Sequence, residues 1–516
     1  MSVYSREKAR RSVFNTIGYR AISQLATIVG YVVLVRVLSE QSFGIYSVLY
    51  SFIPVVSTVA SLGLELTLKR FQPEYLRSGD AAAAAWLTRV VMLARLTSNA
   101  LIIALILLAW NFVAPYFQLT AYRADFALFS VLVLLHFQGR ILEFALASHM
   151  LHRYGVGSTV LLAVVKLAAY GVLAAMHALT LRSAILSDTL AYACAYVFLW
   201  GAYRFNAPGS RAPTTYKPPA AERKRLWRYA LFNNFNDAGS ILLYVQTDNF
   251  FIAALLNPIA VGAYAFYTRI NAMVSNVTPI KLFENVLQPL FFAVAPEQAH
   301  ERLPRYLTLL LNCGLAAQLP IVAYATVFHR EIVGLLLGGK FLEVSWLMPV
   351  IIAFGTTSNV VAIPVTSVAQ YQERASLILL SQIFGVYQIA CMLVLVPLTG
   401  LLGAAIATGT FHLSRNLFVW WRVRRDARWL NFPAVVTSAG LIWGGAIAAA
   451  FEVKRLVPGP VAALACGGVI CGLAALLYVR SPALCRSDRE LLGQLFHGRE
   501  ALLLRRLGLL AAPGHA

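Results

Sequence analysis

The residues that could do chemistry in this sequence are charged side chains inside long apolar runs. Those suited to binding a ligand are basic: Arg20, Arg95, Arg140, Lys166, Arg269 and Lys281. Two acidic residues, Asp237 and Asp248, also lie in apolar surroundings. A charge at the centre of a bilayer costs roughly 2.5–3.5 kcal/mol on insertion scales, so each of these residues should face a partner or a water-filled path.

Four of the basic residues lie deep in their runs. At 1.5 Å per residue, Arg20, Arg95, Arg140 and Lys166 lie about 9–16 Å from the run ends, where a long side chain reaches the interface only with strain. A cationic interior suits an anionic ligand, and Arg pairs with phosphate through two parallel hydrogen bonds. Ion pairs within the protein are the alternative, because Glu143 lies three residues after Arg140 and one predicted helix before Lys166.

The two acidic residues allow two interpretations. A carboxylate in a transporter helix can bind a coupling proton or sodium ion. Asp237 and Asp248 can equally balance a nearby base such as Arg269. Both interpretations stay open from the sequence.

Motifs of soluble enzymes are missing. Gly338-Gly339-Lys340 lacks the first glycine and the hydroxyl residue of a phosphate-binding loop, and there is no HExxH motif. The nine histidines form no ligand set, and the six cysteines are scattered and expected to be free. We therefore expect no cofactor and no metal, and a transporter rather than an enzyme.

Membrane-spanning helices must position these charges. The 516 residues are 59% hydrophobic and 13% charged, with a mean hydropathy of +0.69, whereas a soluble domain carries about 25% charged residues. A membrane span needs roughly 20 apolar residues. Such segments lie near 14–38, 43–68, 87–112, 124–148, 155–178, 183–204, 229–256, 260–291, 305–328, 344–368, 375–398, 400–421, 431–451 and 458–479. The predicted fold is an all-α polytopic membrane protein with about 14 transmembrane helices.

The basic residues between these spans predict the orientation. With the N-terminus inside, cytoplasmic segments hold about 28 Lys and Arg and external loops about 6, as the positive-inside rule requires. Both termini are then cytoplasmic, and the net charge of +21 reflects topology and lipid contact, with no nucleic-acid partner. External loops are too short for a folded catalytic domain outside the membrane.

The chain repeats itself with an offset of 218 residues. Phe43-Gly44-Ile45-Tyr46 recurs as Val261-Gly262-Ala263-Tyr264, and Phe14-Asn15 as Phe232-Asn233. Two parallel repeats around a central cavity are typical of alternating-access transporters. The predicted organisation is an N-lobe at 1–205, a basic cytoplasmic linker at 206–228, a C-lobe at 229–423, two further spans at 424–479 and a cytoplasmic amphipathic tail at 480–516. The last two spans carry Gly440-x-x-x-Gly444 and Gly468-x-x-x-Gly472, expected to be ordinary packing glycines.

Three stretches match a known family. Residues 15–76, from NTIGYRAISQLATIVGYVVLVRVLSEQSFGIYSVLY onward, resemble the first two spans of bacterial polysaccharide exporters. Asp248-Asn249 with Val261-Gly262-Ala263-Tyr264 is similar to that family's seventh-span Asp and following turn, and Gly338 to Pro349 resembles a weaker late feature. The family is that of the Wzx-type flippases of the multidrug/oligosaccharidyl-lipid/polysaccharide (MOP) superfamily.

The resemblance implies two six-helix bundles around a central cavity and translocation of an undecaprenyl-pyrophosphate-linked glycan across the bacterial cytoplasmic (inner) membrane. The pyrophosphate would meet Arg20, Arg95, Arg140 or Lys166. The product would serve exopolysaccharide, capsule or O-antigen (lipopolysaccharide) synthesis, with a polysaccharide polymerase and glycosyltransferases as partners and a proton or sodium gradient as a possible energy source. The two extra spans are similar to those of peptidoglycan-precursor flippases, but the Arg- and Asp-rich opening motif of those proteins is absent.

Two other functions compete with this prediction. A cation-coupled multidrug antiporter of the same superfamily is the first, and the cationic N-lobe disfavours it because such antiporters take cationic drugs. A membrane glycosyltransferase or acyltransferase is the second. It would need a clustered acid–base pair, and the sequence offers none.

Overall fold

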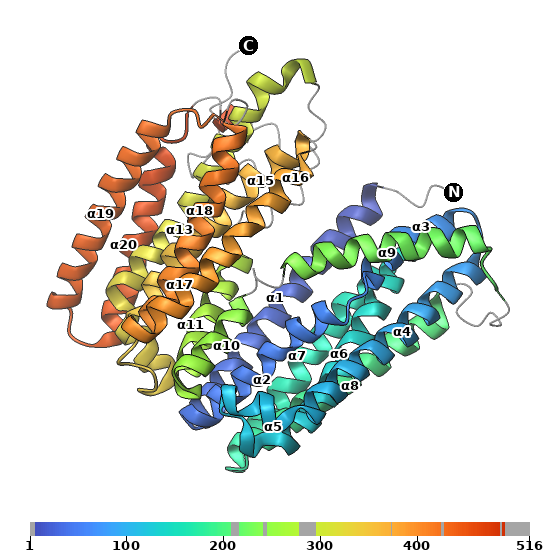
Figure 1. Ribbon diagram of the computed structural model, residues 1–516. Coiled ribbons are helices and arrows are strands. Elements are labelled where there is room, and N and C mark those ends of the chain that lie inside the picture. The colour runs from blue at the N-terminus through green and yellow to red at the C-terminus, as the bar shows by residue number, and fades with distance from the viewer. Residues whose placement is uncertain are drawn as a thin grey trace. The chain divides into compact units, whose positions relative to one another are not determined.

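The protein is described here by a computed structural model. The structure describes residues 6–207, 216–240, 245–277, 296–372, 374–424, 428–485 and 488–490. Throughout these residues the regular elements are helices (Figure 1). The chain divides into two compact units, Met1–Ala263 and Tyr264–Ala516.

The first unit is a bundle of long helices joined by short turns. They are α1 (Arg6–Val37), α2 (Glu40–Val59), α3 (Leu64–Arg77), α4 (Ala81–Leu108), α6 (Arg123–Ser148), α7 (His152–Ala175), α8 (Leu181–Asn206), α9 (Ala220–Ser240) and α10 (Val245–Leu255), with a short α5 (Trp110–Val113). Helices α1 and α8 both pack on α7, and α6 packs on α8. More than half of the apolar stretches of α2 and α6 is buried, whereas less than a quarter of those of α4 and α7 is buried, so α2 and α6 form the interior of this unit.

The second unit has the same construction with more irregularities. Its helices are α11 (Pro258–Val277, begun in the first unit), α13 (Ala299–Leu337), α14 (Leu347–Thr356), α15 (Ala362–Tyr371), α16 (Ala375–Leu380), α17 (Phe384–Thr399), α18 (Leu401–Val423), α19 (Phe432–Leu456) and α20 (Pro460–Arg480). A π-helical turn at Thr357–Val361 joins α14 to α15. Helix α13 contains two prolines and bends at Phe328, whose φ/ψ of −112° and 16° is not helical.

Each of the fourteen predicted spans contains helix, and nine helices in the described part of the chain are long and apolar enough to cross a membrane. The separation near Leu398–Leu401 is confirmed, because Gly400 has a φ of 62° and ends α17. The span predicted at 43–68 is too long. Helix α2 ends at Val59, and the positive φ angles of Leu62 (49°) and Gly63 (63°) start a separate helix, α3.

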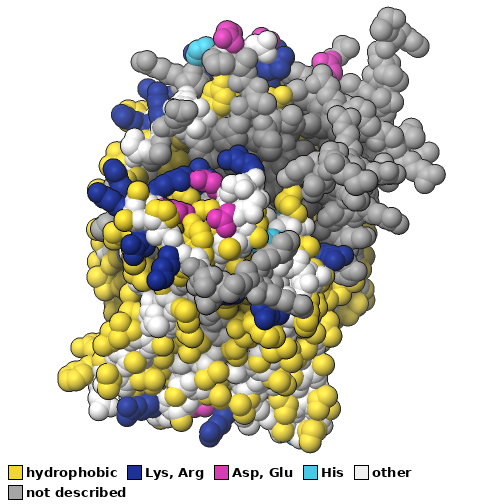
Figure 2. All heavy atoms as spheres, turned by 90° about the vertical axis from the view of Figure 1, so that its right-hand side faces the viewer, with side chains coloured by type: hydrophobic (Ala, Val, Ile, Leu, Met, Phe, Trp, Pro, Cys, Tyr) yellow, Lys and Arg dark blue, Asp and Glu magenta, His cyan; other side chains and the backbone are white. Residues whose placement is uncertain are grey.

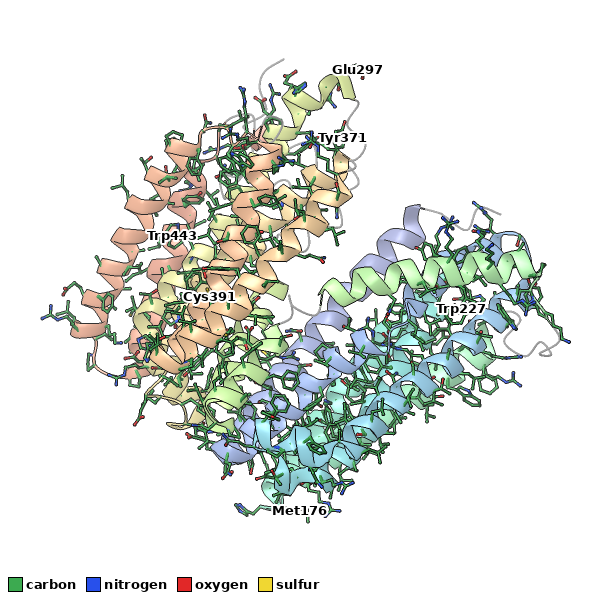
Figure 3. The ribbon with its side chains drawn as sticks, in the orientation of Figure 1. Met176, Trp227, Glu297, Tyr371, Cys391 and Trp443 are labelled. Carbon is green, nitrogen blue, oxygen red and sulfur yellow. The ribbon has the colours of Figure 1, made fainter. Side chains whose placement is uncertain are left out.

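The surface agrees with a membrane protein. Figure 2 shows hydrophobic side chains over the lower and middle parts of one face, with Lys and Arg side chains above them beside a few acidic ones, and further basic side chains at the lower edge. Within the first unit, Met176 at the end of α7 and Trp227 on α9 lie at opposite ends (Figure 3). A basic band bordering an apolar surface is the pattern expected at a membrane interface.

The helix bounds reproduce the 218-residue repeat. Helices α2 and α11 begin and end 218 residues apart, and α4 and α13 begin 218 residues apart. The caps repeat as well: the Ser39 hydroxyl accepts from the Ser42 amide, and the Asn257 side chain accepts from the Ala260 amide at 2.8 Å. The two units therefore share one underlying architecture.

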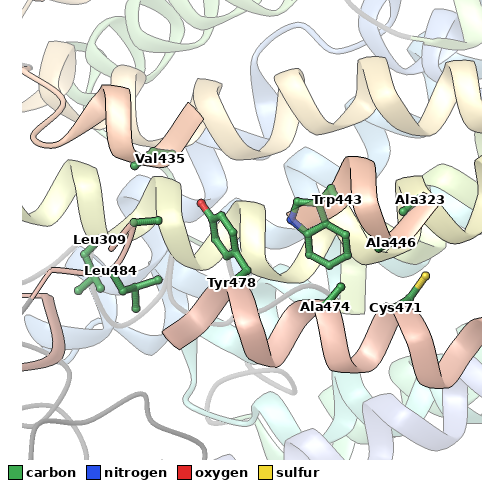
Figure 4. Close-up of a cluster of buried hydrophobic side chains, with 10 residues drawn as sticks. Leu309, Ala323, Val435, Trp443, Ala446, Cys471, Ala474, Tyr478 and Leu484 are labelled. Atoms are coloured by element: carbon green, nitrogen blue, oxygen red, sulfur yellow. The ribbon is translucent and has the colours of Figure 1, made fainter. Parts of the chain in front are cut away.

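The two last helices attach to the second unit through an aromatic core. Trp443 of α19 and Tyr478 of α20 pack together with Leu309 of α13, as Figure 4 shows. The expectation for the GxxxG glycines is wrong, since a Cβ added at Gly440, Gly444, Gly468 or Gly472 would meet nothing within 4 Å. Their neighbour Gly467 makes the close approach instead, where a Cβ would lie 2.1 Å from the ring of Phe328.

Candidate functional site

Two clusters of polar side chains lie among the helices of the first unit. The Asp188 cluster consists of Tyr46, Tyr50, Lys166, Tyr170 and Asp188. The Glu65 cluster consists of Ser57, Glu65, Arg95, Phe137 and Arg140. Each draws its members from at least three helices.

Helical spacing brings the Asp188 cluster together. Tyr46 and Tyr50 are one turn apart on α2, and Lys166 and Tyr170 are one turn apart on α7, so each pair lies on one face of its helix. Both faces meet α8 at Asp188, whose side chain is 0% exposed. A carboxylate this deeply buried requires partners for both oxygens.

Four donors satisfy the Asp188 carboxylate. Tyr46 Oη donates to Oδ2 at 2.7 Å, and Tyr50 donates to the same oxygen. Tyr170 donates to Oδ1, and Lys166 Nζ lies 3.0 Å from Oδ1. Lys166 Nζ also donates to Tyr50 Oη at 3.1 Å. With two donors on each oxygen, the Asp188 carboxylate is fully hydrogen-bonded, and the cluster pairs one acidic side chain with one basic side chain.

The Glu65 cluster is built differently, because two bases share one acid. Glu65 Oε1 lies 3.5 Å from Arg95 Nη2, and Oε2 lies 3.3 Å from Arg140 Nη2. Arg95 Nη2 also donates to the Ser57 carbonyl at 2.8 Å, and its guanidinium lies 4.7 Å from the Phe137 ring centre. Within this cluster two guanidiniums face one carboxylate; Arg95 and Arg140 lie on α4 and α6, which are long and apolar enough to cross a membrane, and Glu65 lies on the shorter α3.

The two arginines of this cluster differ in access. The Arg95 side chain is 0% exposed and the Arg140 side chain is 41% exposed. Arg95 is therefore a fixed part of the interior, and Arg140 is the member that a ligand can reach. A guanidinium in this setting can bind phosphate or carboxylate oxygens through its planar donors.

The turn between α2 and α3 positions Glu65. Leu62 and Gly63 both have left-handed backbone, which separates α3 from α2 and places Glu65 in the first turn of α3. A Cβ at Gly63 would lie 1.9 Å from the Ala230 carbonyl oxygen of α9, so only glycine fits there. The helix N-terminus favours the negative charge of Glu65.

The local ion pairs considered as alternatives do not form. Arg140 pairs with Glu65, while Glu143 accepts a hydrogen bond from Ser158 Oγ at 3.0 Å. Lys166 pairs with Asp188 rather than with Glu143. Arg140 and Lys166 thus pair with acids on other helices. The rules for residues three or four apart on one helix do not predict such pairs.

Of the remaining predicted residues, Arg269 and Asp248 belong to neither cluster. Arg269 is exposed on α11 in the second unit. Asp248 is buried on α10, and its neighbour Asn249 donates to Ser51 Oγ at 2.9 Å. Arg20 and Asp237 lie on helices α1 and α9, but their side chains are outside the described part of the structure, as is the whole of Lys281.

The second unit does not repeat the charges. At the positions equivalent to Lys166 and Asp188 it carries Phe384 and Ile406. An uncharged network occupies the region: Tyr264 Oη donates to Thr408 at 3.5 Å, and Gln388 donates to Thr408 at 3.3 Å. Thus the repeat preserves the helices, while the ion pair of the Asp188 cluster belongs to the first unit.

Sequence reasoning missed Glu65 and the three tyrosines. The spacing of Tyr46 with Tyr50, and of Lys166 with Tyr170, was a usable signal, since it places hydroxyl and amine groups on one helix face. In the described residues, no three His, Cys, Asp or Glu side chains gather as a metal site.

Solved structures share this fold. A structure titled "Lipid II flippase MurJ, inward closed conformation" has a TM-score of 0.65 at 9% identity, covering 90% of this chain and 98% of that one. An inward-facing multidrug resistance MATE family transporter of the MOP superfamily has a TM-score of 0.62 at 15% identity, covering 80% and 98%. No curated protein matches the sequence.

The family model described as "Polysaccharide biosynthesis protein" matches residues 9–293, which is more than half of the chain and includes both polar clusters. This match agrees with the all-helical repeat fold and with the resemblance found in residues 15–76. The chain therefore belongs to the polysaccharide biosynthesis protein family, within the MOP superfamily of flippases and exporters.

Proposed function

We propose that this protein is a flippase that moves a polyprenyl-pyrophosphate-linked oligosaccharide repeat unit across the cytoplasmic membrane by alternating access. Its family belongs to polysaccharide biosynthesis, and the MurJ structure, named as a lipid II flippase, has a similar fold. Both support a lipid-linked glycan as the cargo. No covalent step is needed.

The charge of the Glu65 cluster carries the proposal. Two guanidiniums share one carboxylate, which leaves a positive charge where a bilayer would otherwise exclude it. A pyrophosphate group supplies the opposite charge and fits the planar donors of Arg140. The neutral pair of Lys166 and Asp188 contributes less to anion binding, so Arg140, supported by Arg95, is the primary contact.

The rest of the proposal concerns the cell. The glycan would feed exopolysaccharide, capsule or O-antigen synthesis in the inner membrane, with a polymerase and glycosyltransferases before and after it. Both termini would lie in the cytoplasm. A proton or sodium gradient would supply the energy, with Asp237 and Asp248 as candidate coupling residues.

Mass spectrometry of extracted lipids tests the proposal. Deleting the gene should cause a discrete undecaprenyl-pyrophosphate-linked glycan to accumulate, and its mass identifies the repeat unit. Arg140→Gln should reproduce part of that accumulation. Arg153→Gln, which changes an exposed arginine at the start of α7, is the matched control and should export normally. An unchanged lipid pool after deletion would refute the proposed cargo.

The second candidate is multidrug antiport, since the fold is shared with a MATE transporter. The Asp188 cluster opposes it, because Lys166 already neutralises the buried carboxylate that a cationic drug would need. Drug resistance conferred by expression in a sensitive host, with no change in lipid-linked glycan, would favour this candidate.

A further inference from the structure

The Glu65 carboxylate is held in an unusual way for an ion pair between helices. Each of its oxygens contacts a single Nη2 atom, at 3.5 Å for Arg95 and 3.3 Å for Arg140. Charge-assisted N–H···O bonds are normally 2.7–2.9 Å, and Arg prefers a two-bond fork. Oε1 is buried and has no hydrogen-bond partner of good geometry among the described residues. Glu65 therefore pairs with two arginines, and neither guanidinium forms the two-bond fork that arginine prefers.

On this basis, and resting on the proposed function, we propose that Glu65 is a resident counter-ion that occupies Arg140 in the substrate-free state. The pyrophosphate group of the lipid displaces it from Arg140. Glu65 then remains paired with Arg95 and is not left as an isolated buried charge.

The contacts of Arg95 keep the free-energy cost of displacing Glu65 from Arg140 small. Removing one partner from a buried ion pair is normally strongly destabilising, because the other charge is left uncompensated. Here Arg95 stays in place through Ser57 and Phe137 whether or not Glu65 contacts Arg140. Arg140 contacts Glu65 and the Phe144 ring in the described structure, and its exposure leaves room for a ligand.

Helix α9 determines where Glu65 lies. The Gly63 turn that carries Glu65 fits against the Ala230 carbonyl of α9. Helix α9 is itself fastened to α3, because Arg225 binds the Glu74 carboxylate through two bonds of 2.9 and 3.1 Å. The Leu226 side chain is buried in the same interface. A shift of α9 would therefore move Glu65 and change its distance from the Arg140 guanidinium.

Tyrosines strengthen this attachment. Tyr75 of α3 and Tyr216, just before α9, both donate to Glu222 of α9. Burial raises the pKa of Tyr216 to about 12 and raises the pKa of Tyr75 further, so both phenols remain donors at physiological pH. The Arg225 guanidinium holds the pKa of Glu74 below its ordinary value.

The test measures binding of undecaprenyl pyrophosphate to the purified full-length protein in phosphatidylcholine nanodiscs. Glu65→Gln removes the competing charge and should tighten binding about fivefold, the effect of one partly exposed ion pair. Glu452→Gln, which changes an exposed acid of α19 paired with Arg455, is the matched control for net charge and should change binding less than twofold. Arg140→Gln should weaken binding and abolish the effect of Glu65→Gln in the double variant.

A second variant covers the case in which Glu65→Gln does not fold. Glu65→Asp keeps a charge for Arg95 but withdraws the carboxylate by one methylene, so it should also tighten binding, and only when Arg140 is present. Arg225→Gln removes the exposed ion pair that attaches α9 to α3. It should tighten binding of undecaprenyl pyrophosphate about twofold, as the Glu65 variants do.

The outcomes separate the two proposals. If the wild type binds and Arg140→Gln binds less, but neither Glu65 variant binds more tightly, the counter-ion inference is overturned and the proposed function stands. If the wild type does not bind undecaprenyl pyrophosphate and lipid-linked glycan does not accumulate without the gene, the proposed function itself fails.

Discussion

Replacing Lys166 should destabilise the first unit more than any change at an exposed ion pair. Lys166→Met leaves the fully buried Asp188 with hydroxyl donors and no positive charge. Breaking a buried pair by removing one partner costs about 3–5 kcal/mol. Because three tyrosines still donate to the carboxylate, we expect the lower end, about 3 kcal/mol. The double variant Lys166→Met with Asp188→Asn should recover most of this loss, since no buried charge remains.

The assay is equilibrium unfolding of the purified protein in mixed detergent micelles with increasing sodium dodecyl sulfate. The control is Lys454→Met, which breaks the pair with Glu331 at a similar distance of 2.8 Å but with side chains 26% and 20% exposed. That variant should lose about 1 kcal/mol or less. If Lys166→Met and the double variant lose the same amount, Lys166 acts by packing rather than by charge, and the reasoning is refuted.

Three further predictions follow from glycine positions and one buried acid. Gly63→Ala should destabilise the docking of α9 by more than 2 kcal/mol, because the left-handed backbone costs about 1 kcal/mol and the new Cβ meets a carbonyl at 1.9 Å. Gly79→Ala, with positive φ but nothing within 4 Å, should cost only about 1 kcal/mol, and equal losses in thermal unfolding would contradict this account. Gly467→Ala should lose about 1–3 kcal/mol by overpacking against a ring of α13, whereas Gly468→Ala, its exposed neighbour, should be neutral or slightly stabilising in the same measurement. Burial raises the pKa of Asp488 above its ordinary value, so docking of the segment after α20 is strongest below the unfolded-state pKa and weakens as pH rises through the folded-state pKa. Limited proteolysis of this segment should therefore quicken as pH rises from 4 to 7 and lose that dependence in Asp488→Asn.

The spans could be predicted because hydropathy and a charge-free run of about 20 residues are local properties of the chain. The break at Gly400 was visible for the same reason, as a Thr-Gly between apolar runs. The end of α2 was not visible, since residues 60–63 are as apolar as the helix before them, and only the positive φ angles of Leu62 and Gly63 mark the turn.

The site was predictable in part. Arg95, Arg140 and Lys166 could be identified because each charge interrupts an apolar run, and the structure gives each one an acidic partner. Glu65 could not be paired with Arg140, because 75 residues separate them and hydropathy placed Glu65 inside a span. Long-range pairing of this kind depends on how helices pack, which one sequence does not encode locally.

The contact between Gly44 and Gly262 constrains how this sequence can evolve. A Cβ at Gly262 would lie 3.2 Å from the Gly44 backbone, and the two glycines occupy equivalent positions of the repeat. If one ancestral half was duplicated, the same glycine stood on both sides of this contact, and a single substitution would have enlarged both sides at once. In the present chain a Cβ at Gly44 would lie 1.9 Å from the Pro258 carbonyl oxygen, whereas a Cβ at Gly262 needs only that Gly44 stay small.

The charged positions carry no such mutual restriction. Lys166 and Asp188 bind each other within the first half, while their counterparts Phe384 and Ile406 are apolar. A duplicated scaffold could therefore diverge in its charges without diverging in its helices. The same two helix positions thus accept either an ion pair or two apolar side chains.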